Sequence, residues 1–369
     1  MKNYSSIVLI FSAALIFSIG LLMVFNTSSA EIIDRSLEVN LYTALYKQFA
    51  YGCVGLTLGF VAYKLGYERL LRWSFPLLGA VTLLLAALFV PGIAQTINGA
   101  RRWLSLFGFS FQPSEAAKIL IPAAFIHWFL QRETIDFKSF TQILGWLAIP
   151  AALILIEPDN GTVAILVSLM VVLFLLTRIH WRYWALPLAC LIALGGAAAL
   201  KMPHVPDRIR IYLHPELDLR GKGHQPHQAK IAAGSGGLFG RGLGESLQKL
   251  NYLPEARSDY IAAIYAEETG FLGMLALIGL YSAFAYAGFS IALHAREKGA
   301  FLLAAILTFL IAIQAFLNLG IVSGLLPSKG MTLPFFSQGG SSLMINVAIV
   351  FLLLDISRKS EWAVSGKKY

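Results

Sequence analysis

The stretch 300-AFLLAAILTFLIAIQAFLNLGIV-322 decides the fold class, because it runs for 23 residues without a charged side chain. At a rise of about 1.5 Å per residue, a helix of this length crosses a hydrocarbon core of about 30 Å. The whole chain has the same character: of its 369 residues, 57% are hydrophobic and 13% are charged, whereas soluble domains carry about 25% charged residues. This composition excludes a soluble enzyme, a nucleic-acid-binding module and a secreted disulfide scaffold. The sequence predicts an all-α, polytopic membrane protein.

Hydrophobic windows of about 19 residues indicate transmembrane helices, and the chain contains ten of them. They lie near residues 7–25, 45–63, 73–91, 114–130, 141–156, 162–177, 183–200, 262–293, 300–322 and 338–356. We interpret the first window as a membrane span rather than a cleaved signal peptide, because it lacks a clear small-residue cleavage site. Residues 1–369 are therefore expected to form one integral membrane domain.

The lysine and arginine residues predict the orientation by the positive-inside rule. With the N-terminus inside, the cytoplasmic segments hold 14 of these residues and the short outer connections hold 5. We therefore expect both termini in the cytoplasm and the connection 201–258, between the seventh and eighth helices, outside it. This connection spans 58 residues with nine Lys/Arg and five Asp/Glu, and connections of such length are usually functional. Its positive balance fits either a polyanionic partner or simple solvation.

Two pairs of charged residues lie close to the fourth predicted helix. An ionisable residue at the membrane centre costs at least about 2.5 kcal/mol, so each one is a functional candidate. Glu115 and Lys118 are spaced i, i+3 on one face of the helix start. A neutralising ion pair in a capped helix would explain them, and so would a charged pair facing an outer cavity. Arg101 and Arg102, just before them, favour the cavity.

The segment 156-IEPDNGT-162 places Glu157 and Asp159 between two short predicted helices. Proline, asparagine and glycine are typical of turns, so a solvated hairpin is one interpretation. A carboxylate pair held at or below the membrane surface by the two short helices is the other. The sequence leaves both open.

Four acidic residues lead into the eighth predicted helix from the outside: Glu255, Asp259, Glu267 and Glu268. Asp259 is placed to act as an N-cap or early-turn residue, where the helix dipole favours a carboxylate. A capping role for one residue does not explain four acidic residues near the start of a transmembrane helix. A carboxylate at a membrane–water boundary is also suited to general-base chemistry, because partial burial raises its pKa.

Glycine and other polar patterns give weaker signals. In 327-PSKGMTLPFFSQGGSSL-343, two glycines and two serines open the last helix, and backbone amides there favour an anion site; a re-entrant turn without a ligand is the alternative. The glycines of 234–244 fit neither GxGxxG nor Walker A, and predict a flexible or tightly turning external loop. No histidine pair has metal-site spacing.

Gln314 and Asn318, spaced i, i+4, predict interhelical hydrogen bonds rather than a ligand site.

Five segments of the chain resemble the SEDS family (shape, elongation, division and sporulation). They are 98-NGARRWL-104, 112-QPSEAAK-118, 157-EPDNGT-162, 242-GLGESLQKLNYLPEARSDYIAAIYAEETGFLG-273 and 327-PSKGMTLPFFSQGGSSL-343. Their order, the ten spans and the large outer loop match as well, so the resemblance covers essentially the whole chain. Residues 242–250 look like the cell-division branch rather than the elongation branch. The chain departs from the usual family pattern at Arg257-Ser258 and at Tyr260-Ile261-Ala262, on either side of Asp259.

The resemblance implies a peptidoglycan glycosyltransferase of the bacterial inner membrane, which polymerises lipid II on the extracytoplasmic side. It implies a class B penicillin-binding protein and other division-complex membrane proteins as partners. By resemblance, Asp259 is the general base for the acceptor 4-hydroxyl, which inverts the donor's anomeric carbon as undecaprenyl diphosphate leaves. The expected substrate-binding residues are Arg101, Arg102, Glu115, Lys118, Glu157, Asp159, Glu255, Lys329, Ser341 and Ser342.

No cofactor follows with certainty, although a divalent cation, Mg²⁺ or Mn²⁺, would stabilise the departing diphosphate. Three alternatives remain open at this point: a lipid II flippase, an elongation-type polymerase and a non-catalytic scaffold. A flippase would use the same spans and lipid, but the inverted repeats of many transporters are not evident in the sequence. A scaffold would leave the embedded charged pair and the acids around Asp259 without a purpose.

Overall fold

The computed structural model describes residues 2–34, 40–97, 100–106, 109–189, 212, 223–250, 253, 256–327 and 330–362. These residues are mostly helical, and residues 181–189 form one further helical stretch. The helices are α1 (Lys2–Asp34), α2 (Thr43–Leu65), α3 (Tyr67–Ala87), α4 (Pro113–Leu130), α5 (Phe137–Ile156), α6 (Asn160–Leu176), α9 (His224–Ser235), α10 (Ile261–Leu293), α11 (Lys298–Val322) and α12 (Gly340–Trp362).

The all-α prediction was wrong between α3 and α4, where a small antiparallel sheet forms. Its strands are β1 (Ala94–Ile97), β2 (Ala100–Leu106) and β3 (Phe109–Phe111), in the order β1-β2-β3. This segment is rich in aromatic and β-branched residues, which suit a pleated, half-exposed surface. Strand pairing also satisfies backbone groups that have no helix to join.

Six helices of the described part are long and apolar enough to cross a membrane. They comprise Tyr4–Ala30, Tyr67–Ala87, Phe137–Ile156, Ile261–Leu293, Lys298–Val322 and Gly340–Ser360, and Asn160–Leu176 is a shorter apolar helix. A polytopic membrane protein is therefore confirmed. Helices α2 and α4 coincide with two further predicted windows, and the seventh window falls partly outside the described residues. The count of ten spans stays a prediction.

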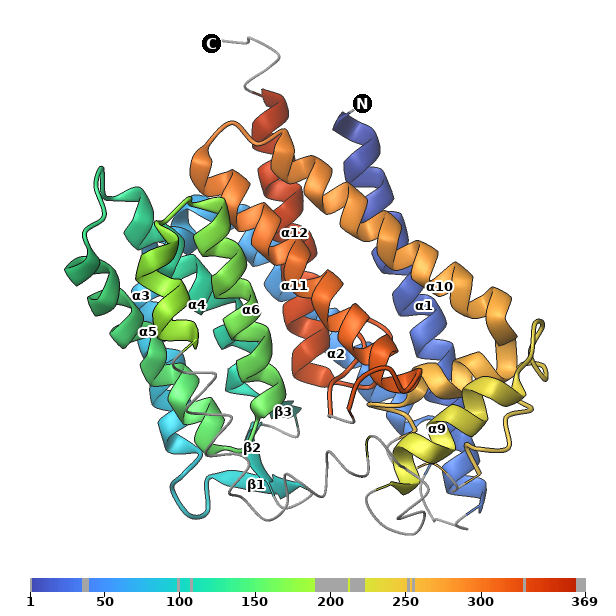
Figure 1. The fold of residues 1–369 in the computed structure, drawn as a ribbon. Helices are drawn as coiled ribbons and strands as arrows, with labels where there is room; N and C mark the ends of the chain where they lie inside the picture. Colours follow the sequence, from blue (N-terminus) through green and yellow to red (C-terminus); the bar gives the residue numbers. More distant parts are fainter. Residues whose placement is uncertain are drawn as a thin grey trace.

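The helices form one bundle with two distinct ends (Figure 1). Helix α1 begins and α12 ends at the same end, whereas the sheet and α9 lie at the opposite end, which we call the sheet end. Helix α12 packs on α2, α1 packs on α10, and α10 packs on α11. Glycines allow the close approach of α2 and α12: a Cβ at Gly55 would lie 3.1 Å from the Cα of Met344. Small residues at helix interfaces serve this purpose in membrane bundles.

Helix α10 is sharply kinked near its start. Gly270 has φ 67° and ψ −164°, outside the helical region, and such a conformation is accessible to glycine without the penalty that a Cβ brings. The kink separates residues 261–269 from residues 271–293. The long eighth window of the sequence thus contains a short leading helix and a span-length helix.

Candidate active site

Three of the predicted motifs meet at the sheet end: the segment of Asp259, the turn 157–162 and residues 330–343. A Cβ at Gly330 would lie 2.9 Å from Oδ2 of Asp259, and a Cβ at Gly161 would lie 3.4 Å from the side chain of Met331. Asn318 donates from Nδ2 to the carbonyl of Asp259 at 2.9 Å and to that of Met331 at 2.6 Å. The segment before α12 therefore connects the start of α10, α11 and the α5–α6 turn.

Asp259 lies just before α10, with its side chain half-buried. The prediction that it caps the helix was wrong by one residue: the N-cap is Tyr260, which makes no side-chain cap hydrogen bond. The backbone on either side is fixed, because the carbonyl of Arg257 accepts a hydrogen bond from the amide of Gln338 at 3.0 Å.

Gln314 and Asn318 were predicted to make interhelical hydrogen bonds, and this was wrong in detail: Asn318 bonds to the segments before α10 and α12 rather than to a helix, and the buried Gln314 Oε1 has no hydrogen-bond partner within the described residues. Asn318 is buried in α11, and its two donated bonds hold the start of α10 against the segment before α12. It is thereby a positioning residue for the backbone that carries Asp259.

Glu115 and Lys118 form a buried ion pair in the first turns of α4, with Nζ 2.8 Å from Oε2. The prediction that they share one face is confirmed. The pair neutralises two charges that would otherwise be costly to bury. Its role in substrate binding stays a prediction.

Arg102 joins the sheet to the α5–α6 turn. Its Nε donates to the carbonyl of Glu157 at 3.0 Å, and its Nη2 donates to that of Pro158 at 2.9 Å. Arg101, its neighbour on β2, is exposed. The structure thus brings Arg102, but not Arg101, together with the predicted carboxylate pair.

The two acids of the turn differ in their surroundings. Asp159 caps α6: it accepts bonds from the amide and hydroxyl of Thr162 at 3.2 and 2.8 Å, and from Nε2 of Gln112 at 3.3 Å. Glu157 is 3% exposed, and neither of its carboxylate oxygens has a hydrogen-bond partner within the described residues. Burial, together with the charge of Asp159, raises the pKa of Glu157 to about 8, and Arg102 opposes this shift.

Within the residues that the structure describes, no cluster of three or more His, Cys, Asp or Glu side chains could hold a metal ion. Mg²⁺ is often bound by one or two carboxylates together with substrate phosphates. Glu157, with its two unsatisfied oxygens beside Asp159, fits such a shared site rather than a resident metal centre.

The serines at the start of α12 are engaged with the protein. Ser341 accepts from the amide of Gln112 at 2.8 Å and donates to the carbonyl of Ser110 at 3.1 Å. Ser342 bonds to Thr332 and to Asn346, at 3.1 and 3.3 Å. These contacts attach the start of α12 to its neighbours, and the predicted anion contact stays untested. Two other predicted residues, Glu255 and Lys329, lie outside the described residues.

Sequence reasoning missed Gln48 and Tyr51 of α2. Gln48 donates to the carbonyl of Ser337 at 3.1 Å and accepts from the amide of Gly339 at 3.4 Å. Tyr51 accepts from the amide of Ser110 through its hydroxyl at 2.8 Å. Their spacing of i, i+3 in an apolar helix was the available signal, because polar residues in such helices usually bond to a neighbouring segment.

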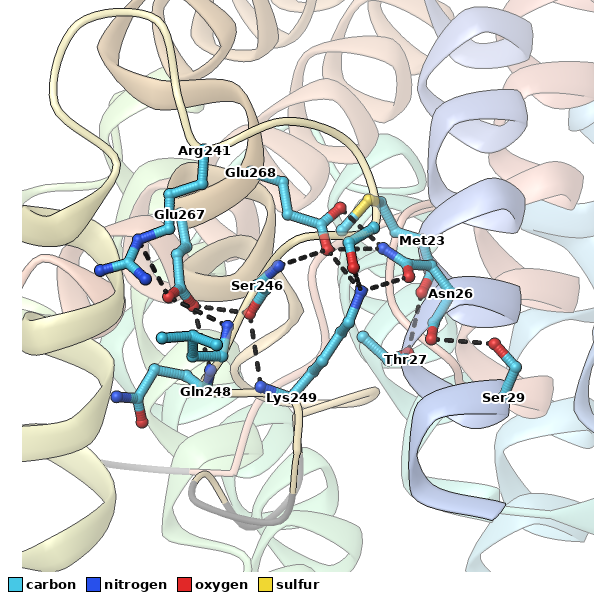
Figure 2. A network of polar contacts seen from close by, with 12 residues as sticks. Met23, Asn26, Thr27, Ser29, Arg241, Ser246, Gln248, Lys249, Glu267 and Glu268 are labelled. Atoms are coloured by element: carbon cyan, nitrogen blue, oxygen red, sulfur yellow. Dashed lines mark hydrogen bonds and ion pairs between the residues drawn. The ribbon is translucent and has the colours of Figure 1, made fainter. Parts of the chain in front are cut away.

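Glu267 and Glu268, which the sequence groups with Asp259, belong to a separate network (Figure 2). Glu268 pairs with Lys249 at 2.9 Å and accepts from Asn26 of α1 at 2.8 and 2.6 Å. Glu267 accepts from the hydroxyl of Ser246 at 2.6 Å and lies 3.6 Å from Nε of Arg241. These two acids therefore attach residues 241–249 to α10 and α1.

The chain matches the family model FtsW/RodA/SpoVE, described as cell cycle protein, over residues 6–362. It is 37% identical over 362 residues to a "Probable peptidoglycan glycosyltransferase FtsW" of Alcanivorax borkumensis, covering 96% of this chain and 93% of that one. This relative is therefore similar along nearly its full length.

Two solved structures share the fold. A chain in the structure described as "Structural coordination of polymerization and crosslinking by a peptidoglycan synthase complex" has a TM-score of 0.77 and 27% identity, covering 95% of this chain and 97% of that chain. The Thermus thermophilus Rod shape determining protein RodA has a TM-score of 0.69 and 28% identity, with 95% and 96% covered. Together with the matched residues 6–362, these likenesses show that the chain belongs to the FtsW/RodA/SpoVE family of cell cycle proteins.

Proposed function

We propose that this chain is a peptidoglycan glycosyltransferase of the FtsW type, which polymerises lipid II into glycan strands during septal wall synthesis. The family membership and the names of its relatives support this activity. The observation that carries the site assignment is the position of Asp259, half-buried beside Gly330 where the predicted motifs meet.

Asp259 acts as the general base in this proposal. It takes the proton from the acceptor 4-hydroxyl, whose oxygen attacks the anomeric carbon of the donor. The bond from that carbon to the undecaprenyl diphosphate breaks with inversion, and the diphosphate leaves with the electron pair. A positioned base contributes about 10²–10⁴-fold to such a step. Asn318 and the amide of Gln338 hold the backbone on either side of the carboxylate.

Four cationic residues would bind the diphosphate in this proposal. Arg102 is already fixed against the carbonyls of residues 157–158, and Arg101 is exposed on the same strand. Lys118 and Lys329 complete the proposed set, while Glu115, Glu255, Ser341 and Ser342 would orient sugars or phosphates. A divalent cation bound at Glu157 and Asp159 would neutralise further diphosphate charge.

We infer that the sheet end faces the outside of the inner membrane and that both termini are cytoplasmic. The excess of basic residues in the opposite connections supports this orientation, and the start of α1 and the end of α12 share one end. The whole chain then forms one membrane domain. A class B penicillin-binding protein is the proposed partner, since a structural neighbour is a chain of a peptidoglycan synthase complex. Other division-complex membrane proteins complete the proposed assembly.

The test is a pair of assays on the protein reconstituted in liposomes with its class B partner and Mg²⁺. One assay measures glycan strands formed from labelled lipid II, and the other measures transfer of lipid II between leaflets. Strands from the wild type without accelerated transfer would support the polymerase. Accelerated transfer without strands would replace the proposal by a flippase. The absence of both activities would favour a scaffold.

A further inference from the structure

The loop 236–242, between α9 and α10, is bound to the kink of α10 by backbone hydrogen bonds. The kink at Gly270 removes the i, i+4 partners of the groups on either side of it. The loop supplies them: Arg241 N donates to Glu267 O at 3.0 Å, Gly242 N to Glu268 O at 3.0 Å, Phe271 N to Gly237 O at 2.9 Å, and Leu272 N to Leu238 O at 3.2 Å. The loop is therefore part of the same rigid unit as the start of α10.

Glycines make this close contact possible, so of the flexible and the tightly turning loop predicted for residues 234–244, the described part has the tight turn. A Cβ at Gly240 would collide with the carbonyl of Glu268, and a Cβ at Gly236 would collide with that of Ala266. Two ion pairs, Glu268 with Lys249 and Glu267 with Arg241, also attach residues 241–249 to α10 (Figure 2). The loop thus has a defined position relative to α10.

This fixed loop carries large apolar side chains that are largely exposed. Leu238 is 63% exposed and Phe239 is 79% exposed, beside Phe271 at 59% and Leu272 at 48% on α10. We call these four residues the apolar shoulder. An exposed apolar patch of this kind usually marks a surface that contacts a membrane or a protein.

The shoulder continues into the exposed side of α10. After the kink, exposed Leu275 and Ile278 follow Phe271 and Leu272 at helical spacing, along a helix that is long and apolar enough to span the membrane. Leu238 bonds to the first turn of that span through its backbone, so its side chain lies at the same level. Arg241 follows at once and is partly exposed, and a long cationic side chain there can reach lipid phosphates.

We propose that the apolar shoulder is embedded in the bilayer leaflet at the sheet end, with Phe239 among the acyl chains and Arg241 at the headgroups. The loop then holds residues 261–269, and Asp259 before them, at a fixed depth next to the headgroup region. Lipid is favoured as the occupant because the shoulder is continuous with the exposed stripe of a membrane span.

The test places a nitroxide spin label at Phe239→Cys, in the full chain with Cys53→Ser and Cys190→Ala, in lipid nanodiscs without a partner protein. Collision with oxygen reports acyl chains, and collision with a water-soluble nickel chelate reports water. Leu275→Cys provides the lipid-facing reference and Glu245→Cys provides a water-exposed reference on the same connection. Each variant must keep the gel-filtration profile and unfolding midpoint of the unlabelled protein.

We expect the label at position 239 to collide preferentially with oxygen, as the label at 275 does. A label at 239 that collides with the chelate as strongly as the label at 245 would overturn the proposal. A label that is water-accessible alone and becomes protected only when a class B penicillin-binding protein is added would also overturn it, and would assign the shoulder to a protein interface.

Discussion

Glu268 and Glu157 are both almost completely buried acids at the sheet end, at 1% and 3% exposure, yet their surroundings are opposite. Glu268 pairs with Lys249 and accepts two bonds from Asn26. Glu157 has no hydrogen-bond partner for either oxygen within the described residues, and its pKa is raised to about 8. Buried polar groups that only support a fold are normally satisfied, whereas perturbed and unsatisfied ones cluster at functional sites. The comparison separates a structural region around Glu268 from the proposed substrate region around Glu157 and Asp259.

The largest expected effect on stability comes from Lys249→Met, which leaves Glu268 buried without its cation. Removing one partner of a buried ion pair costs about 3–5 kcal/mol. We expect a loss of this size in the free energy of unfolding, measured by denaturant titration in mixed micelles. The exposed Lys47→Met is the matched control, with little expected effect. A loss below about 1 kcal/mol in Lys249→Met would show that the Glu268 network does not stabilise the fold.

The Asn318→Ala substitution tests how the backbone of the region around Asp259 is held, because Asn318 bonds to the carbonyls of Asp259 and Met331. It removes two donated hydrogen bonds, one buried and one part-buried, each worth about 0.5–1.5 kcal/mol. We expect a loss of about 1–3 kcal/mol in unfolding free energy, together with reduced polymerisation because the backbone of Asp259 is released. Unchanged polymerisation in a destabilised variant would limit Asn318 to a purely structural role.

A Gly330→Ala substitution disturbs the substrate region while sparing the Glu268 network. The new Cβ would lie 2.9 Å from Oδ2 of Asp259, so the carboxylate must move. Displacement of a catalytic group by about 1 Å costs as much as 10²-fold in rate. We expect a fall of about tenfold or more in turnover with lipid II, and a small change in the unfolding midpoint. Equal turnover in the wild type and in Gly330→Ala would show that the Asp259 carboxylate need not occupy its present position.

The smallest effect is a change in pH dependence in Glu157→Gln. The folded state raises the pKa of Glu157 from 4.5 to about 8, so the folded protein binds this proton more tightly than the unfolded chain. The stability that it contributes is complete below pH 4.5 and is lost as pH rises through about 8. We expect the unfolding midpoint to fall less between pH 5 and pH 8 in the variant, whereas the exposed Glu245→Gln should follow the wild type. Parallel curves for Glu157→Gln and wild type would contradict the burial argument.

The sequence predicted the helices well, because hydrophobic length is a local signal that stretches such as 300–322 carry by themselves. It did not predict the sheet, since the pairing of β1 with β2 depends on a turn and a register that no hydrophobic pattern encodes. The Gly270 kink was also missed, because residues on both sides of it remain apolar and helix-forming.

For the site residues, too, local sequence signals predicted some features, and others depended on three-dimensional packing. The motifs around Asp259, Glu157 and Ser341 pointed to one outer site, and the structure brings their segments together. Sequence could not separate Asp259 from Glu267 and Glu268, because the contacts that engage Glu268 come from Lys249 and from Asn26, and Asn26 lies 242 positions away. The burial of a carboxylate and its hydrogen-bond partners depend on how the helices pack, so they can be determined only from the three-dimensional structure.

The central claim, that Asp259 is the catalytic base, is tested most directly by the polymerisation rate of Asp259→Asn with labelled lipid II, the class B partner and Mg²⁺. Asparagine keeps the size of the side chain and removes its basicity. We predict a rate lowered by about 10²–10⁴-fold, with lipid II binding and the unfolding midpoint unchanged, while Glu245→Gln keeps the wild-type rate. An Asp259→Asn protein that forms glycan strands within tenfold of the wild-type rate would contradict the assignment.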